Sequence, residues 1–264
     1  MTEQSVLLET KSDVAYVTLN RPDVHNAFDE HVIARFSDIL DELSGNADIK
    51  TIVFQGRGKS FSAGADLNWM KRAAAFSETE NKADALKLAQ MLQKLYTLPK
   101  LTIACVQGVA LGGGLGLVSC CDVVIADKSA SFGFSEVKLG LVPATISPYV
   151  IAAIGPRQAR RYFQTAERFD GVTAQRIGLV HEIAERPEDM EYILHTILKD
   201  VAACGPNAMA TAKKLCMDLI CKPITASTLN DTAACIAQAR AGAEAKEGLA
   251  AFLEKRKTNW IKGC

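Results

Sequence analysis

The sequence predicts an α/β fold, and three patterns lead to that prediction. Short runs rich in β-branched and aromatic residues alternate with amphipathic runs in the first half of the chain. Two glycine-rich joints each follow such a short run and precede a helical one. Past about Glu188 only helical patterns remain. Because strands joined by helical crossovers favour an α/β fold, we expect a core at residues 1–187 and a helical C-terminal region at residues 188–264.

The individual elements follow from the spacing of apolar residues along the chain. An amphipathic helix repeats its apolar residues every three or four positions, whereas a buried strand is a short apolar run. Pro99 ends one of the helical patterns, since the residue before a proline avoids the helical region. The expected strands are residues 14–19, 51–55, 101–106 and 122–126, and the expected helices are residues 30–43, 80–96, 113–119, 190–203, 207–219 and 226–257.

Composition excludes several classes of partner and site. The chain has 264 residues with 30 basic and 30 acidic side chains, so its net charge favours neither nucleic acid nor an anionic membrane as the main partner. The eight cysteines never form a C-x-x-C pair, and several lie in apolar runs, so we expect reduced core thiols. The four histidines match no metal-ligand spacing, and we expect no metal site.

The first residues and the hydropathy pattern bear on location. The N-terminal stretch has neither a basic segment followed by an apolar one nor an Arg-rich amphipathic pattern. No apolar run reaches the ~18 residues that a bilayer span requires. We therefore expect a cytoplasmic protein with no membrane partner.

The glycine-rich joints are the first candidates for a site. They comprise residues 61–67 (FSAGADL) and 108–114 (GVALGGG). Small residues let a ligand approach the backbone, and the free N–H groups at a helix start carry the positive end of its dipole. Two such joints side by side would direct two donors at one oxygen.

Three familiar glycine motifs do not fit. In a P-loop ending at Gly58-Lys59-Ser60, the first glycine would fall on Val53, inside a strand. In a dinucleotide fingerprint at residues 112–116, the third glycine would fall on Leu117. The G-x-S-x-G turn of serine hydrolases is missing.

The two joints form part of a longer series of motifs that resembles the crotonase (enoyl-CoA hydratase/isomerase) family. The resemblance runs through nearly the whole chain. The motifs are Leu19-Asn20-Arg21-Pro22, Asn26-Ala27-Phe28, residues 61–67, residues 111–114, Cys121-Asp122, Phe132-Gly133, Glu136 with residues 139–143, and Glu247-Gly248 with residues 252–257.

The resemblance implies a fold, an assembly and a substrate class. The fold would be a spiral of β-β-α units with a C-terminal helical region that forms trimers, often paired into hexamers. The substrate would be an acyl-coenzyme A thioester, and no separate cofactor would be needed because coenzyme A belongs to the substrate.

By position, the resemblance also assigns site residues. Ala65 and Gly113 would supply two backbone N–H groups to the thioester oxygen, and Glu136 would be the acid–base group. Lys255 resembles a family position that reaches the nucleotide phosphate, although a solvated helix end explains it equally well. The residues implied in binding the coenzyme A arm are Val24, His25, Ala27, Ala63, Asp66, Leu67, Gly112 and Lys255.

One departure from the family pattern narrows the choice among the activities of the family. Well-known hydratases carry two glutamates, and Gly116 stands where the first would be, leaving Glu136 alone. Together with residues 66–70 and 143–149, this resembles hydratases of 3-methylglutaconyl-CoA or isohexenylglutaconyl-CoA, which serve leucine and acyclic-terpene breakdown. The alternative is a Δ3,Δ2-enoyl-CoA isomerase of fatty acid metabolism. A non-catalytic acyl-CoA or RNA-binding protein is the alternative of another class.

Overall fold

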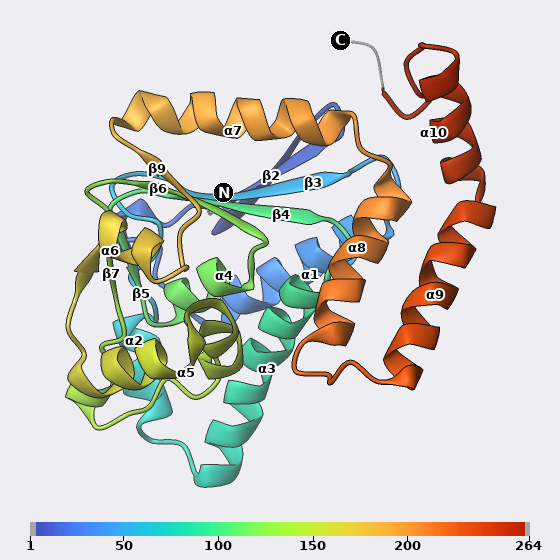
Figure 1. Cartoon of the computed structure of the whole chain (residues 1–264). Coiled ribbons are helices and arrows are strands. Elements are labelled where there is room, and N and C mark those ends of the chain that lie inside the picture. Colours follow the sequence, from blue (N-terminus) through green and yellow to red (C-terminus); the bar gives the residue numbers. More distant parts are fainter. Residues whose placement is uncertain (1–3, 262–264) are drawn as a thin grey trace. The chain divides into compact units, whose positions relative to one another are not determined.

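A computed structural model describes residues 4–261, which divide into two compact units. The first runs to Leu194 and the second begins at His195, so the division falls within helix α7 (Pro187–Ala202). The expected α/β fold is confirmed, with a helical C-terminal region (Figure 1). The boundary expected at residues 187 and 188 stays a prediction.

The main sheet of the first unit has six strands in the order β1-β2-β3-β4-β6-β9. The first two pair antiparallel, and every later neighbour is parallel. Their bounds are β1 Val6–Lys11, β2 Val14–Leu19, β3 Thr51–Gly56, β4 Leu101–Val106, β6 Val123–Asp127 and β9 Glu182–Ala184. All four expected strands are present in this sheet.

A second, smaller sheet extends the same unit. Strands β5 (Val109–Leu111), β7 (Ser131–Gly133) and β8 (Phe169–Asp170) pair in that order. The sequence reasoning did not foresee them, since two or three residues are too few to show an alternating pattern.

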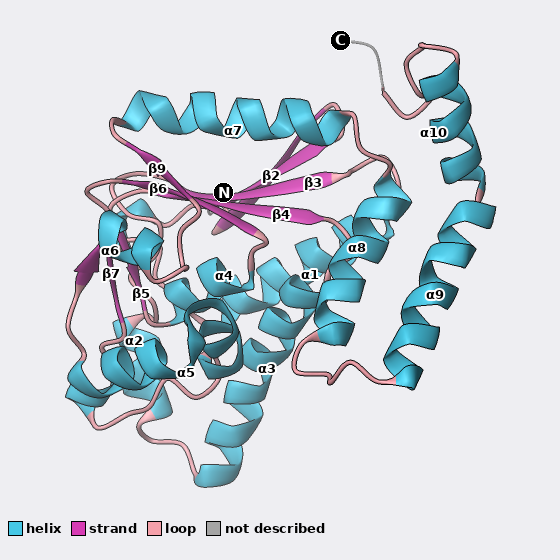
Figure 2. Cartoon of the chain, viewed as in Figure 1, coloured by secondary structure: helices cyan, strands magenta, loops and turns pink. Residues whose placement is uncertain are grey.

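Each glycine-rich joint leads into a helix, and helices pack against the main sheet (Figure 2). Helix α4 (Gly113–Cys120) is apolar on all sides and buried from Gly114 on, as an all-apolar helix must be. The expected helices at 30–43 and 80–96 are α1 (Glu30–Gly45) and α3 (Glu78–Thr97). The remaining helices of this unit are α2 Leu67–Ala73, α5 Ser147–Thr165 and α6 Gly171–Arg176, with short 3-10 turns at η1 Pro22–Val24 and η2 Glu136–Leu139.

The second unit is helical. After α7 come α8 (Pro206–Leu219), α9 (Ala226–Ala241) and α10 (Ala243–Leu253). The single helix expected over residues 226–257 is wrong, because the backbone turns out of the helical region at Gly242 (φ −69°, ψ 155°) and a new helix starts there.

The structure bears on two expectations from composition, the lack of a membrane span and the burial of the cysteines. In the described part of the chain no helix has both the length and the apolar character to cross a bilayer. Cys105 and Cys120 are buried, as expected of core thiols. Cys204, Cys216 and Cys221 are exposed, so the expectation of core thiols is wrong for these three.

Candidate functional site

The two glycine-rich joints lie side by side in the first unit. The Ser62 N–H donates to the Val109 carbonyl at 3.0 Å, and the Leu111 N–H donates back to the Ser62 carbonyl at 2.9 Å. A Cβ built on Gly64 would lie 2.8 Å from the Leu111 carbonyl oxygen and 3.5 Å from the Gly113 nitrogen. Gly64 also has a φ of +89°, which L side chains rarely adopt. A glycine at position 64 thus permits the close contact between the joints.

The amides of Ala65 and Gly113 are the two predicted donors. Within residues 4–261 neither N–H has a hydrogen-bond acceptor. Phe28 holds the backbone on both sides of Ala65, since its N–H donates to the Gly64 carbonyl and its carbonyl accepts from the Asp66 N–H, both at 2.7 Å. Gly113 begins α4, where the first N–H groups have no partner within the helix. The structure therefore brings two fixed, unused donors onto neighbouring segments.

Glu136 reaches the start of α4 from η2. A Cβ on Gly112 would lie only 3.1 Å from its Oε1 atom, so the carboxylate rests over Gly112, next to Gly113. Its Oε2 atom is buried and has no hydrogen-bond partner among the described residues. Burial raises the pKa of this carboxyl above that of an ordinary glutamate. A carboxylate with one buried, unpartnered oxygen beside the Gly112–Gly113 turn is suited to proton transfer.

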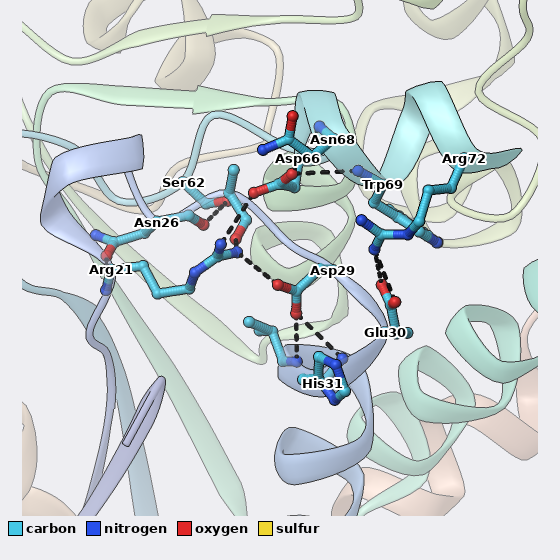
Figure 3. A network of polar contacts seen from close by, with 12 residues as sticks. Arg21, Asn26, Asp29, Glu30, His31, Ser62, Asp66, Asn68, Trp69 and Arg72 are labelled. Atoms are coloured by element: carbon cyan, nitrogen blue, oxygen red, sulfur yellow. Dashed lines mark hydrogen bonds and ion pairs between the residues drawn. The ribbon is translucent and has the colours of Figure 1, made fainter. Parts of the chain in front are cut away.

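Arg21 organises the first joint through a polar network (Figure 3). Its guanidinium forms ion pairs with Asp66 at 2.9 Å and Asp29 at 3.1 Å, and donates to the Ala27 carbonyl at 2.7 Å. The Asp66 carboxylate also accepts from the N–H groups of Asn68 and Trp69, capping α2. The Asp66 side chain therefore has a structural role.

Asn26 and Ser62 complete this support. Asn26 donates to the carbonyls of Arg57 and Ser60, and its own carbonyl accepts from the Ser62 hydroxyl at 2.9 Å. The Ser62 hydroxyl accepts in turn from the Gly64 N–H at 3.2 Å. The sequence reasoning gave these residues no role, although Arg21 and Asn26 lie in its first two motifs.

The other predicted binding residues are divided between the two units. His25 has a positive φ of 52°, its ring Nδ1 lies 3.1 Å from the Ser60 hydroxyl, and its carbonyl accepts from the Ala63 N–H. Val24 and Leu67 are exposed, whereas Ala27 is buried. Lys255 belongs to the second unit, where it follows α10 with a φ of 56°. Within the described chain no group of three or more His, Cys, Asp or Glu side chains could hold a metal ion.

Gly116 does not leave the open space that its missing side chain suggests. A Cβ at this position would lie 2.3 Å from Cγ2 and 3.1 Å from Cβ of Ile146, which is 2% exposed. Ile146 precedes α5 and belongs to the segment 143–149 that departs from the family pattern. Any extra room for a substrate branch must therefore come from another part of the site.

Comparison with known proteins finds similar chains over nearly the whole length of this one. Residues 9–263 match the family model described as enoyl-CoA hydratase/isomerase. The chain is 30% identical to the crotonyl-CoA hydratase of Syntrophomonas wolfei, with 99% of each protein covered. A crystal structure of an enoyl-CoA hydratase from Shewanella pealeana superposes with a TM-score of 0.94 at 42% identity, covering 97% of this chain and 96% of that one. Pseudomonas aeruginosa AtuE superposes with a TM-score of 0.93 at 36% identity, covering 98% and 99%.

Proposed function

Because the chain belongs to the enoyl-CoA hydratase/isomerase family, we propose that it hydrates the 2,3 double bond of a branched glutaconyl-type enoyl-CoA. 3-Methylglutaconyl-CoA and isohexenylglutaconyl-CoA are the substrates of this type. The observation that carries the proposal is the position of Glu136, a single carboxylate with a buried oxygen beside the Gly112–Gly113 turn. Gly116 offers no second carboxylate one turn further along α4.

The amides of Ala65 and Gly113 bind the thioester oxygen in this proposal. When a nucleophile adds at C3, the electrons of the double bond move toward the carbonyl, and negative charge develops on that oxygen. Donors that are already fixed stabilise this charge without reorganising during the reaction. The Arg21 network and the contacts of Phe28 keep the Ala65 amide in place.

Glu136 performs both halves of the proton transfer. It removes a proton from water as the water oxygen bonds to C3, and it returns that proton to C2 of the enolate on the same face. One carboxylate suffices because it ends each cycle in the ionised state in which it began. Its raised pKa brings it closer to neutral pH, where an acid–base group serves both steps well.

The distal carboxylate of a glutaconyl group needs a polar partner, and the candidates are five side chains in or beside α2 and residues 143–149, namely Lys71, Arg72, Thr145, Ser147 and Tyr149. Arg72 is engaged by both oxygens of Glu30 at 2.7 Å. Tyr149 packs on Tyr96, and burial, together with Cys120 at the far end of α4 from Gly113, raises the pKa of the Tyr149 hydroxyl. Ser147 donates to the Ala144 carbonyl. Lys71 and Thr145 have no partner within residues 4–261, which favours them for this role.

The contact between Gly116 and Ile146 also supports the second candidate, a Δ3,Δ2-enoyl-CoA isomerase. An isoleucine side chain offers no hydrogen bond to a water molecule, whereas proton transfer between C4 and C2 requires only Glu136 and the two amides. Both activities use the same groups, and they differ in whether water becomes part of the product.

Incubation in H₂¹⁸O with an enoyl-CoA panel tests the proposal. We expect a 3-hydroxyacyl-CoA labelled at C3, detected by mass spectrometry, with 3-methylglutaconyl-CoA or isohexenylglutaconyl-CoA turned over faster than crotonyl-CoA. Double-bond migration without label would contradict hydration and favour the isomerase. Binding without turnover of any member would contradict both activities.

We further propose that the helical unit assembles the protein into a trimer or a dimer of trimers. Support comes from a groove of about 1130 Å³ along α8, α9 and α10, and from exposed apolar side chains that include Leu229, Phe252 and Leu253. Buried apolar surface is the usual driving force of stable homo-oligomers. Multi-angle light scattering should give the mass of three or six chains at micromolar concentration, and a stable monomer would contradict the proposal.

A further inference from the structure

Glu136 and Ile146 both contact the first turns of α4. Gly112 is the N-cap of this helix, and the Gly116 N–H donates to its carbonyl at 3.1 Å, so the two glycines are one helical turn apart. The Glu136 carboxylate covers Gly112, where a Cβ would lie 3.1 Å from Oε1. Ile146 covers Gly116, where a Cβ would lie 2.3 Å from Cγ2. The catalytic carboxylate and an apolar side chain thus lie one turn apart at the start of α4.

Ile146 is held too firmly to give way. Its carbonyl accepts from the N–H groups of Tyr149 and Val150 at the start of α5, at 3.2 and 3.1 Å. The atoms that would collide with a side chain at position 116 are its β-carbon and a methyl bonded directly to it, not the end of a long chain. Leu92 of α3 closes the same space, with its Cδ1 atom 3.7 Å from where a Cβ on Gly116 would lie. Position 116 therefore accepts only glycine while isoleucine stands at 146.

We propose that Ile146 determines the specificity of the site by occupying the volume that a side chain at position 116 would need, which excludes a second acid–base group. The proposal rests on the assignment of Glu136 as the acid–base group in the proposed function. With Ile146 present, the wall beside Glu136 is apolar, in keeping with the buried, unpartnered Oε2 atom. Chemistry that needs two carboxylates, such as efficient hydration of an unbranched enoyl-CoA, is then unavailable.

A pair of exchanges tests this inference. In the double variant Gly116→Glu/Ile146→Gly, removing the isoleucine makes room for a glutamate on the turn next to Glu136. We expect kcat/KM for crotonyl-CoA hydration to rise at least ~10-fold over the wild type, a lower bound set below the ~10²–10⁴ that an ideally positioned acid–base group contributes. The pH profile should gain a second ionisation, which a change in packing alone would not produce.

Matched variants distinguish the effect of the added carboxylate from the effect of the added space. Gly116→Gln/Ile146→Gly has the same volume without an ionisable group, and Ile146→Gly alone has only the space. Neither should gain crotonyl-CoA activity. The proposal would be overturned if Gly116→Glu/Ile146→Gly folds but gains no crotonyl-CoA activity. It would also be overturned if Gly116→Gln/Ile146→Gly gains as much activity as the glutamate variant. The readout does not depend on the natural substrate, so failure of the glutaconyl assignment would leave it interpretable.

Thermal unfolding checks the packing independently of activity. Gly116→Ala should lower the unfolding temperature of the wild type. The same change should lower the unfolding temperature much less in the Ile146→Gly background, because the stability effects of mutations at two residues in contact are not additive. Equal costs in both backgrounds would show that Ile146 does not fill the space at position 116, and would overturn the inference at its first step.

Discussion

Glu136→Gln should lower kcat by at least ~10²-fold, the lower end of what positioned acid–base catalysis contributes. Glutamine keeps the size of the side chain but cannot accept a proton from water. Loss of the conjugated ultraviolet absorbance of the enoyl-CoA measures turnover, and titration calorimetry with a product acyl-CoA should show that binding persists. A variant that binds and turns over like the wild type would contradict the assignment of Glu136.

The same variant should not lose stability, which separates a catalytic from a structural role. The Oε2 atom of Glu136 is buried without a partner, and burial raises its pKa in the folded protein. A group with a raised folded pKa stabilises the fold below its unfolded pKa, and this contribution is lost as pH rises through the folded value. At neutral pH the ionised carboxylate therefore opposes folding, and glutamine removes that cost.

Thermal unfolding across a pH series makes this expectation measurable. The unfolding temperature of Glu136→Gln should equal or exceed that of the wild type at neutral pH, and the difference should shrink in acid as Glu136 becomes protonated. The activity of the wild type should fall as the pH drops through the raised pKa of Glu136, because the protonated carboxyl cannot accept a proton from water. A marked loss of stability at neutral pH would indicate instead that Glu136 forms a structural contact.

Gly113→Pro should lower kcat by ~10²–10³-fold, the effect typical of losing one oxyanion donor. A backbone donor is removable only through the backbone, and proline lacks the N–H group. Proline is tolerated at the first position of a helix, where the missing N–H would have no partner within the helix. The measurement is kcat on the best substrate of the panel, together with far-ultraviolet circular dichroism to verify folding.

Gly113→Ala is the matched control for this prediction. Any Cβ at position 113 would lie 3.3 Å from the Phe28 ring, so alanine reproduces the Cβ contact of proline but keeps the N–H group. The alanine variant should retain far more activity than the proline variant. If both lose activity equally, contact with Phe28 explains the effect, and the role of the Gly113 amide as an oxyanion donor is wrong.

Local patterns in the sequence accounted for much of the first unit. Residues 14–19 and 30–43 were predictable because their apolar residues repeat at strand or helix spacing. The two small-residue joints were recognisable because each links a strand to a helix. Gly242 was overlooked within an apolar pattern that continues on both sides of it, and the break there follows from backbone angles that periodicity does not reveal.

The sequence by itself determined the α/β fold and named Glu136, Ala65 and Gly113, because each stands in a local motif. Only the tertiary structure decided what surrounds them. The sequence showed only that Gly116 lacks a side chain, and packing places Ile146, thirty positions later in the chain, against it. The network joining Arg21 to Asp66 likewise links segments that are distant in sequence. Such contacts depend on how strands and helices pack, and local spacing carries no information about them.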